Sequence, residues 1–124
     1  MNGYSVEIKM SSRELSAKER VAIKDTGTCI RLDEATKNDK VTIIPSFYCV
    51  LNIHNEKSAD KDYENYIIVD KDGVKYVTGS ESLWSSFINI ATEMEGEEEE
   101  WGIEVYRMPS KNYSGKDFLT CSII

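Results

Sequence analysis

The chain has 124 residues, 40% of them hydrophobic, which is enough for one buried core but leaves no room for a second domain of ordinary size. No stretch approaches the roughly 18 apolar residues of a membrane-spanning helix, and residues 1–10 lack the pattern of a secretory signal, so we expect a cytoplasmic protein. The three cysteines, Cys29, Cys49 and Cys121, lack metal-binding spacing, which fits a reducing compartment and argues against a zinc site.

The net charge of −7 is unfavourable for a protein that binds a polyanion. Six of the acidic residues, however, are glutamates in the segment from Glu93 to Glu100, and without these six charges the balance of −7 becomes −1. The acidity is therefore mostly local, and the field at another face depends on which charges lie there.

The first forty residues are predicted to be an N-terminal extension. Tyr4–Met10 alternates between polar and apolar residues as a half-buried strand does. Ser16 and Glu19 have the spacing of a capping box, which predicts a short helix over about Ala17–Lys24. Cys29–Leu32 is consistent with a short strand, and Asp33–Lys40 with a polar connector.

From residue 41 the pattern is clearer. Val41–Ile53 predicts a long strand in which Pro45 suits an edge or a bend, because proline cannot donate to a strand ladder. Two strands, Tyr66–Val69 and Val74–Val77, are predicted to form a hairpin closed by a turn at Asp72-Gly73. That turn would place Ile67, Val69, Val74 and Tyr76 on one side, and Tyr66, Ile68, Lys75 and Val77 on the other.

An apolar stripe at helical spacing predicts a helix over about Ser82–Met94, with Ser80 or Ser82 as the N-cap. Its members are Leu83, Phe87, Ile90, Ala91 and Met94. Two further strands, Trp101–Met108 and Asp117–Ile124, follow. The residues predicted to point inward are Trp101, Ile103, Val105, Leu119, Cys121 and Ile123.

Five strands with one helix between the third and the fourth predict a mainly β fold, an OB-like Greek-key barrel over residues 41–124. Together with the extension over residues 1–40, this predicts a single domain, 1–124. The faces and loops of OB-folds bind oligonucleotides and oligosaccharides. Nucleic-acid binding is therefore the leading hypothesis, and a sugar or another small ligand is a weaker one.

The segment from Arg107 to Lys116 combines cations with an aromatic ring, the two components that single-strand binding proteins use for phosphates and bases. A solvated hairpin loop of the same composition is the alternative. Outward aromatic rings with Lys75 beside them would form a second part of the site, unless they pack against the extension. The predicted nucleic-acid-binding residues are Lys75, Arg107, Lys111, Lys116, Tyr48, Tyr66, Tyr106 and Tyr113.

Catalytic signatures are missing from the sequence. His54 is the single histidine and has no serine or cysteine elbow near it, and there is no glycine-rich phosphate loop or metal-ligand spacing. We therefore expect a protein without enzymatic activity, metal or cofactor. The glutamate run from Glu93 to Glu100 has three interpretations: a solvated loop, an internal competitor for the basic groove, or a surface that imitates nucleic acid for a protein partner.

The chain resembles small single-stranded DNA-binding proteins from bacteriophages of Gram-positive bacteria over roughly residues 41–124. The resemblance lies in Asn55–Ser58, Asp62-Tyr63, Tyr66–Gly73, Tyr76–Ser82 and Pro109–Tyr113 followed by Thr120-Cys121. It implies an OB-fold that binds single strands in phage replication or recombination. The chain ends in the apolar segment Cys121–Ile124 and not in an acidic tail, so partner recruitment would fall to the 93–100 acidic loop. The alternative is an acidic phage accessory or anti-defence protein that binds a host protein.

Overall fold

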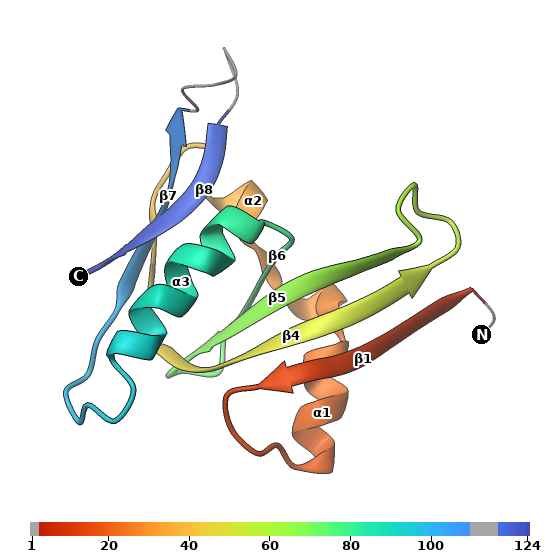
Figure 1. Ribbon diagram of the computed structural model, residues 1–124, viewed down its shortest axis with the longest axis horizontal. Coiled ribbons are helices and arrows are strands. Elements are labelled where there is room, and N and C mark those ends of the chain that lie inside the picture. Colours follow the sequence, from red (N-terminus) through yellow and green to blue (C-terminus); the bar gives the residue numbers. More distant parts are fainter. Residues whose placement is uncertain (1–2, 110–116) are drawn as a thin grey trace. The chain divides into compact units, whose positions relative to one another are not determined.

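The computed structural model describes residues 3–109 and 117–124, and this part of the chain is mainly β, as the sequence predicts (Figure 1). Eight strands lie in two sheets, of strand order β1-β4-β5-β6-β2 and β3-β7-β8. The strands are β1 (Tyr4–Ser11), β2 (Ile30–Arg31), β3 (Val41–Ile43), β4 (Pro45–Asn55), β5 (Asp62–Asp70), β6 (Lys75–Thr78), β7 (Ile103–Pro109) and β8 (Asp117–Ile123). The α-helices are α1 (Ala17–Lys24), α2 (Leu32–Ala35) and α3 (Glu81–Glu93).

The chain folds into two compact units, each built from two stretches of sequence. The first unit comprises Met1–Ile30 and Ser46–Gly79, and the second comprises Arg31–Pro45 and Ser80–Ile124. The chain passes from the second unit back into the first near Pro45, where the predicted long strand breaks into β3 and β4. A proline at the start of β4 suits this break, since it has no N–H to donate to a ladder.

The core of the first unit lies on one face of β4 and β5. Phe47, Cys49, Leu51 and Ile53 share this face, as their alternation predicts, and pack with Ile67, Val69 and Val77. Helix α1 adds Ile23, which is 2% exposed. The predicted capping box begins this helix, because Ser16 Oγ accepts from the Glu19 amide at 3.1 Å while Glu19 Oε1 accepts from the Ser16 amide at 2.9 Å.

The hairpin of β5 and β6 forms where predicted, but its register differs by one residue. Val69 pairs with Lys75 and Ile67 with Val77, so Lys75 and Val77 lie on the same face as Ile67 and Val69. The reason is the turn, which is longer than the two residues assumed: the Asp70 amide donates to the Val74 carbonyl at 2.9 Å, leaving three residues between. A shift of one residue moves every side chain of a strand to the opposite face.

The second unit contains the three-stranded sheet, with α3 running alongside β8 (Figure 1). Ser80 caps α3 by accepting from the Leu83 amide, as predicted. Ser82 and Ser86 hold the helix against β8 through hydrogen bonds to the Leu119 carbonyl at 2.8 Å and the Thr120 hydroxyl at 3.0 Å. The buried side chains of this unit include Leu83, Phe87, Ala91, Ile103, Val105, Leu119 and Cys121.

The expectation for Ile123 is wrong. It was expected to point inward, yet it is 48% exposed and lies beside Ile90 and Met94 at the end of α3. The Asp33–Lys40 segment, expected to be a polar connector, includes most of the helical turn α2, after which the Thr36 hydroxyl donates to the Leu32 carbonyl at 2.7 Å.

The two sheets are not closed into the predicted five-stranded barrel. Among the described residues, β8 pairs only with β7, and the free edge of β6 is covered by β2. Strand β2, which comes from the N-terminal segment, therefore occupies the edge of β6. A strand that closed the barrel would have to pair with that same edge. Within the same described ranges, no helix has the length and apolar character required to cross a membrane.

Candidate nucleic-acid interface

Lys75, predicted to contact phosphate, is instead used inside the first unit. Its Nζ donates to the Ala22 carbonyl at 2.6 Å and to the Thr28 hydroxyl at 2.5 Å, with the Asp25 carbonyl at 3.3 Å. A cation at the C-terminus of a helix satisfies free carbonyls and interacts favourably with the helix dipole. Lys75 therefore caps α1, and its ammonium has its donors committed to the protein.

The predicted tyrosines of the first unit are also poorly suited to stacking a base. Tyr66 is 5% exposed, and its hydroxyl contacts Glu64 Oε1 at 3.4 Å. Tyr48 is half-buried on β4. Both rings are therefore at least partly withdrawn from solvent.

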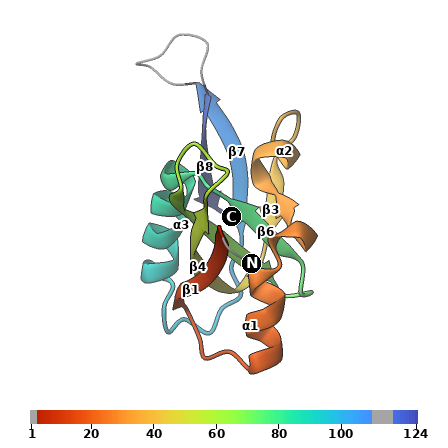
Figure 2. The ribbon, with the colours of Figure 1, turned by 90° about the vertical axis from the view of Figure 1, so that its right-hand side faces the viewer.

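Tyr106 and Arg107, both predicted site residues, lie together in the second unit and line one pocket of about 560 Å³. The other lining residues come from the segment after α2 and from the start of β8. They are Thr36, Lys37, Asn38, Asp39, Lys40 and Asp117. Figure 2 shows α2 close to the upper part of β7, which brings these segments, distant in sequence, to one place. We call this pocket the β7 groove.

Arg107 is anchored at the groove and retains donor capacity. Its Nη2 donates to the Asp33 carbonyl at 2.6 Å. Its Nε is buried without a hydrogen-bond partner in the described ranges. A guanidinium has five N–H donors in a fixed planar arrangement that matches phosphate oxygens, but the buried Nε of Arg107 is out of reach of an approaching anion, so an anion would have to bind the terminal nitrogens.

Tyr106 places an aromatic ring beside a cation. Its hydroxyl is 2.6 Å from Ser122 Oγ, which fixes the ring, and Lys40 Nζ lies 5.6 Å from the ring centroid. Lys40 also pairs with Glu104 at 3.3 Å, and Lys37 with Glu34 at 3.1 Å. Both are surface ion pairs, which are weak enough for the ammonium groups to exchange partners with a phosphate.

Lys37 and Lys40 were missed in the sequence because the polar segment containing them gives no periodic signal. Its two lysines were the available clue, but only the fold brings them to Tyr106 and Arg107. The groove lining holds three cations and two carboxylates, Asp39 and Asp117, while Glu34 and Glu104 pair with two of the cations from outside the lining. Lys111, Tyr113 and Lys116, the remaining predicted site residues, lie outside the described residues.

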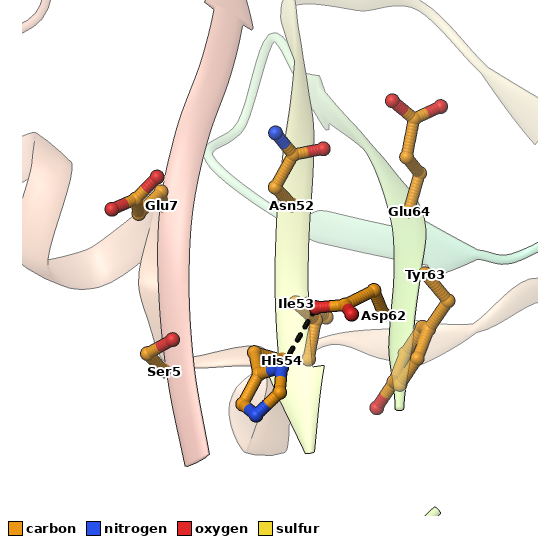
Figure 3. A pocket seen from close by; sticks show the side chains of 8 residues that line it. All are labelled: Ser5, Glu7, Asn52, Ile53, His54, Asp62, Tyr63 and Glu64. Atoms are coloured by element: carbon orange, nitrogen blue, oxygen red, sulfur yellow. Dashed lines mark hydrogen bonds and ion pairs between the residues drawn. The ribbon is translucent and has the colours of Figure 1, made fainter. Parts of the chain in front are cut away.

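A second pocket, of about 460 Å³, lies on β1, β4 and β5 of the first unit (Figure 3). Its carboxylates, Glu7, Asp62 and Glu64, make it unfavourable for a phosphate backbone. His54 donates or accepts through both ring nitrogens, with Nδ1 2.7 Å from Asp62 and Nε2 2.7 Å from Glu56. These hydrogen bonds, first to Asp62 and then to Glu56, raise the pKa of His54 above its ordinary 6.5.

The hydrogen bonds to Asp62 and Glu56 occupy both ring nitrogens of His54, so neither nitrogen is left to act on a substrate in this arrangement. Burial raises the pKa of the Cys121 thiol to about 11 and also raises that of Cys49, so neither is activated as a thiolate. No group of three or more histidine, cysteine or acidic side chains is placed to hold a metal ion within the ranges that the structure describes.

Comparison with known proteins gives no match among family models, curated proteins or solved structures.

Proposed function

We propose that this protein binds single-stranded DNA without catalysis and with little sequence preference, through the β7 groove, during phage DNA replication or recombination. The observation that carries the proposal is that Lys37, Lys40, Tyr106 and Arg107 line one pocket, with Lys40 Nζ 5.6 Å from the centroid of the Tyr106 ring. Proteins that bind single strands combine cations along the backbone with aromatic rings on which bases stack.

The strand pairing supports an open variant of the OB-fold. Counting β3 and β4 as one bent strand, β4, β5 and β6 are three consecutive antiparallel strands, and β7 returns through α3 to pair with β3. This is the 4-1-2-3 order of a Greek key. The fifth strand, β8, then adds to β7, and OB-folds are partly open barrels of five such strands.

Two further points support the proposal. The acidic face around Glu7, Asp62 and Glu64 belongs to the first unit, whereas the β7 groove belongs to the second. The resemblance of residues 41–124 to phage single-strand binding proteins gives the biological setting.

The test is a fluorescence-anisotropy titration of labelled oligothymidine at several salt concentrations. If Lys37, Lys40 and Arg107 each neutralise one phosphate, log K should fall against log salt with a slope of about −2, or about 20-fold in affinity between about 50 and 200 mM. Binding that is absent at low salt, or that ignores salt, would contradict the proposal.

The double variant Lys37→Ala, Lys40→Ala should reduce the salt slope by about 1.4, because each single-strand phosphate contact contributes about 0.7. Both side chains are exposed, so the fold should survive. The matched control is Lys18→Ala, Lys57→Ala, which removes two exposed lysines of the first unit and should leave the slope unchanged.

A further inference from the structure

A second candidate surface lies in the second unit, on the side of α3 that meets the end of β8. A pocket of about 330 Å³ is lined there by Ile90, Met94 and Ile123, with Asn89 and Glu93 at its border. Ile90 and Met94 belong to the apolar stripe of α3 but remain partly exposed, and Ile123 is 48% exposed. These three side chains form an apolar groove open to solvent, which we call the α3 groove.

Strong negative charge adjoins the α3 groove. Glu93 lines it, and the exposed residues Glu95 and Glu97–Glu100 follow directly in the chain. No described residue forms an ion pair with Glu93, Glu95, Glu97, Glu98 or Glu99. The last turn of α3 also contains no basic residue.

This arrangement is unfavourable for the isolated protein. The C-terminus of a helix carries partial negative charge. Nearby glutamates repel this charge and destabilise the helix end, whereas a cation would stabilise it. Repulsion among the glutamates adds to the effect. A positively charged partner placed here would reduce the repulsion between the glutamates and the helix C-terminus and the repulsion among the glutamates. It would also cover the exposed apolar side chains.

We infer that the α3 groove is a docking site for a basic amphipathic segment of a partner protein. An apolar side chain of the segment packs on Ile90, Met94 and Ile123, and its lysines or arginines lie against the glutamates. Apolar anchors give such contacts their affinity, and complementary charge gives the association rate and specificity.

Electrostatic repulsion disfavours two other occupants of the α3 groove, single-stranded DNA and a second copy of the chain. Single-stranded DNA would bring its phosphates against the glutamates, so it belongs at the β7 groove. A symmetric pair of chains would place the same patch of each copy together, and the two glutamate runs would repel each other.

The probe is a synthetic amphipathic helical peptide of leucine and lysine, with a control peptide in which every lysine is replaced by glutamate. Titration against the isotope-labelled protein, followed by NMR, should shift Ile90, Met94 and Ile123 with the lysine peptide and leave them unchanged with the glutamate peptide. Equal binding of both peptides, or shifts confined to other residues, would overturn the inference.

Two variants test the groove separately from the charge. Ile123→Asp should weaken the lysine peptide about tenfold or more, whereas Val21→Asp, at an apolar residue of α1 that is 71% exposed, should have little effect. Unchanged affinity of Ile123→Asp would overturn the inference, as would a concentration-dependent dimer of the unaltered protein that this substitution abolishes.

The triple variant Glu97→Gln, Glu98→Gln, Glu99→Gln leaves the apolar groove intact and should also weaken the lysine peptide about tenfold. Its control, Glu7→Gln, Glu14→Gln, Asp60→Asn, makes the same change of charge at exposed positions of the first unit. An equal effect of both triple variants would show only a response to net charge and would overturn the inference. Oligothymidine affinity of the glutamate variant should be unchanged or tighter, which separates this site from the β7 groove.

Discussion

Tyr106 offers the sharpest test among single residues, because its ring and its hydroxyl have different roles. In the proposed function the ring is the stacking surface, whereas the hydroxyl forms a hydrogen bond with Ser122 at 2.6 Å. Tyr106→Phe should keep most of the affinity for oligothymidine, whereas Tyr106→Leu should lose about 1–3 kcal/mol of binding free energy. Anisotropy titrations measure both, and urea unfolding shows whether either variant is destabilised. Equal binding by the two variants would exclude the ring from the site.

Glu19 provides a prediction on pH. Hydrogen bonds from Arg13, then from the Ser16 amide, lower the pKa of Glu19 from its ordinary 4.5 to about 2. A carboxylate with a depressed folded-state pKa stabilises the protein above about pH 4.5, and the contribution is lost as the pH falls toward about 2. Glu19→Gln keeps a side chain suited to the capping box but removes the charge.

Urea unfolding of wild type and Glu19→Gln at intervals from about pH 6 down to about pH 2 measures this effect across the range from 4.5 to about 2. The stability difference between them should be largest at the upper end and small at the lower end, where the folded-state carboxylate is half protonated. A Glu14→Gln control, at an exposed neighbour, should track the wild type throughout. A constant difference between wild type and Glu19→Gln at every pH would contradict the assignment.

Among the elements, the β5–β6 turn depends on Gly73, whose φ is +85°. This left-handed conformation costs a residue with a Cβ about 1–2 kcal/mol, and Gly73 has open space around it, so strain is the whole effect. Gly73→Ala should therefore lower the free energy of unfolding by about 1 kcal/mol or slightly more.

Gly73→Asn should cost less than Gly73→Ala, since asparagine tolerates this conformation better. Gly27→Ala is the matched control, because Gly27 lacks a positive φ and an added Cβ would make only ordinary contact. Denaturant unfolding compares all three variants. A Gly73→Ala protein as stable as the Gly27→Ala protein would show that the turn has a different geometry.

The elements also show what local patterns can and cannot predict. The capping box predicts α1, the apolar stripe predicts α3, and the alternation predicts the inward face of β4. Each of these patterns depends on residues close in sequence. The register of β6 depends on whether the turn holds two or three residues, and both choices place Asp72-Gly73 at the bend. Lys75 was consequently assigned to the wrong face.

At the scale of the whole molecule, the prediction of a β-rich chain is confirmed, whereas closure into a barrel is not found. Closure could not be predicted, because it depends on which strand takes the edge of β6, and a two-residue strand such as β2 has too weak a pattern to compete in the sequence. The β7 groove is likewise a tertiary feature. Arg107 and Tyr106 were identified from composition, but Lys37 and Lys40 join them only through the fold.

The most direct test of the central claim is an NMR titration of the isotope-labelled protein with oligothymidine at low salt. Binding through the β7 groove predicts shifts of the amide signals of residues 36–40, Tyr106, Arg107 and Asp117, and little change at Glu7, Asn52 and Glu64 of the acidic face. The absence of shifts at saturating oligothymidine, or shifts confined to the acidic face, would contradict the assignment of single-strand binding to this groove.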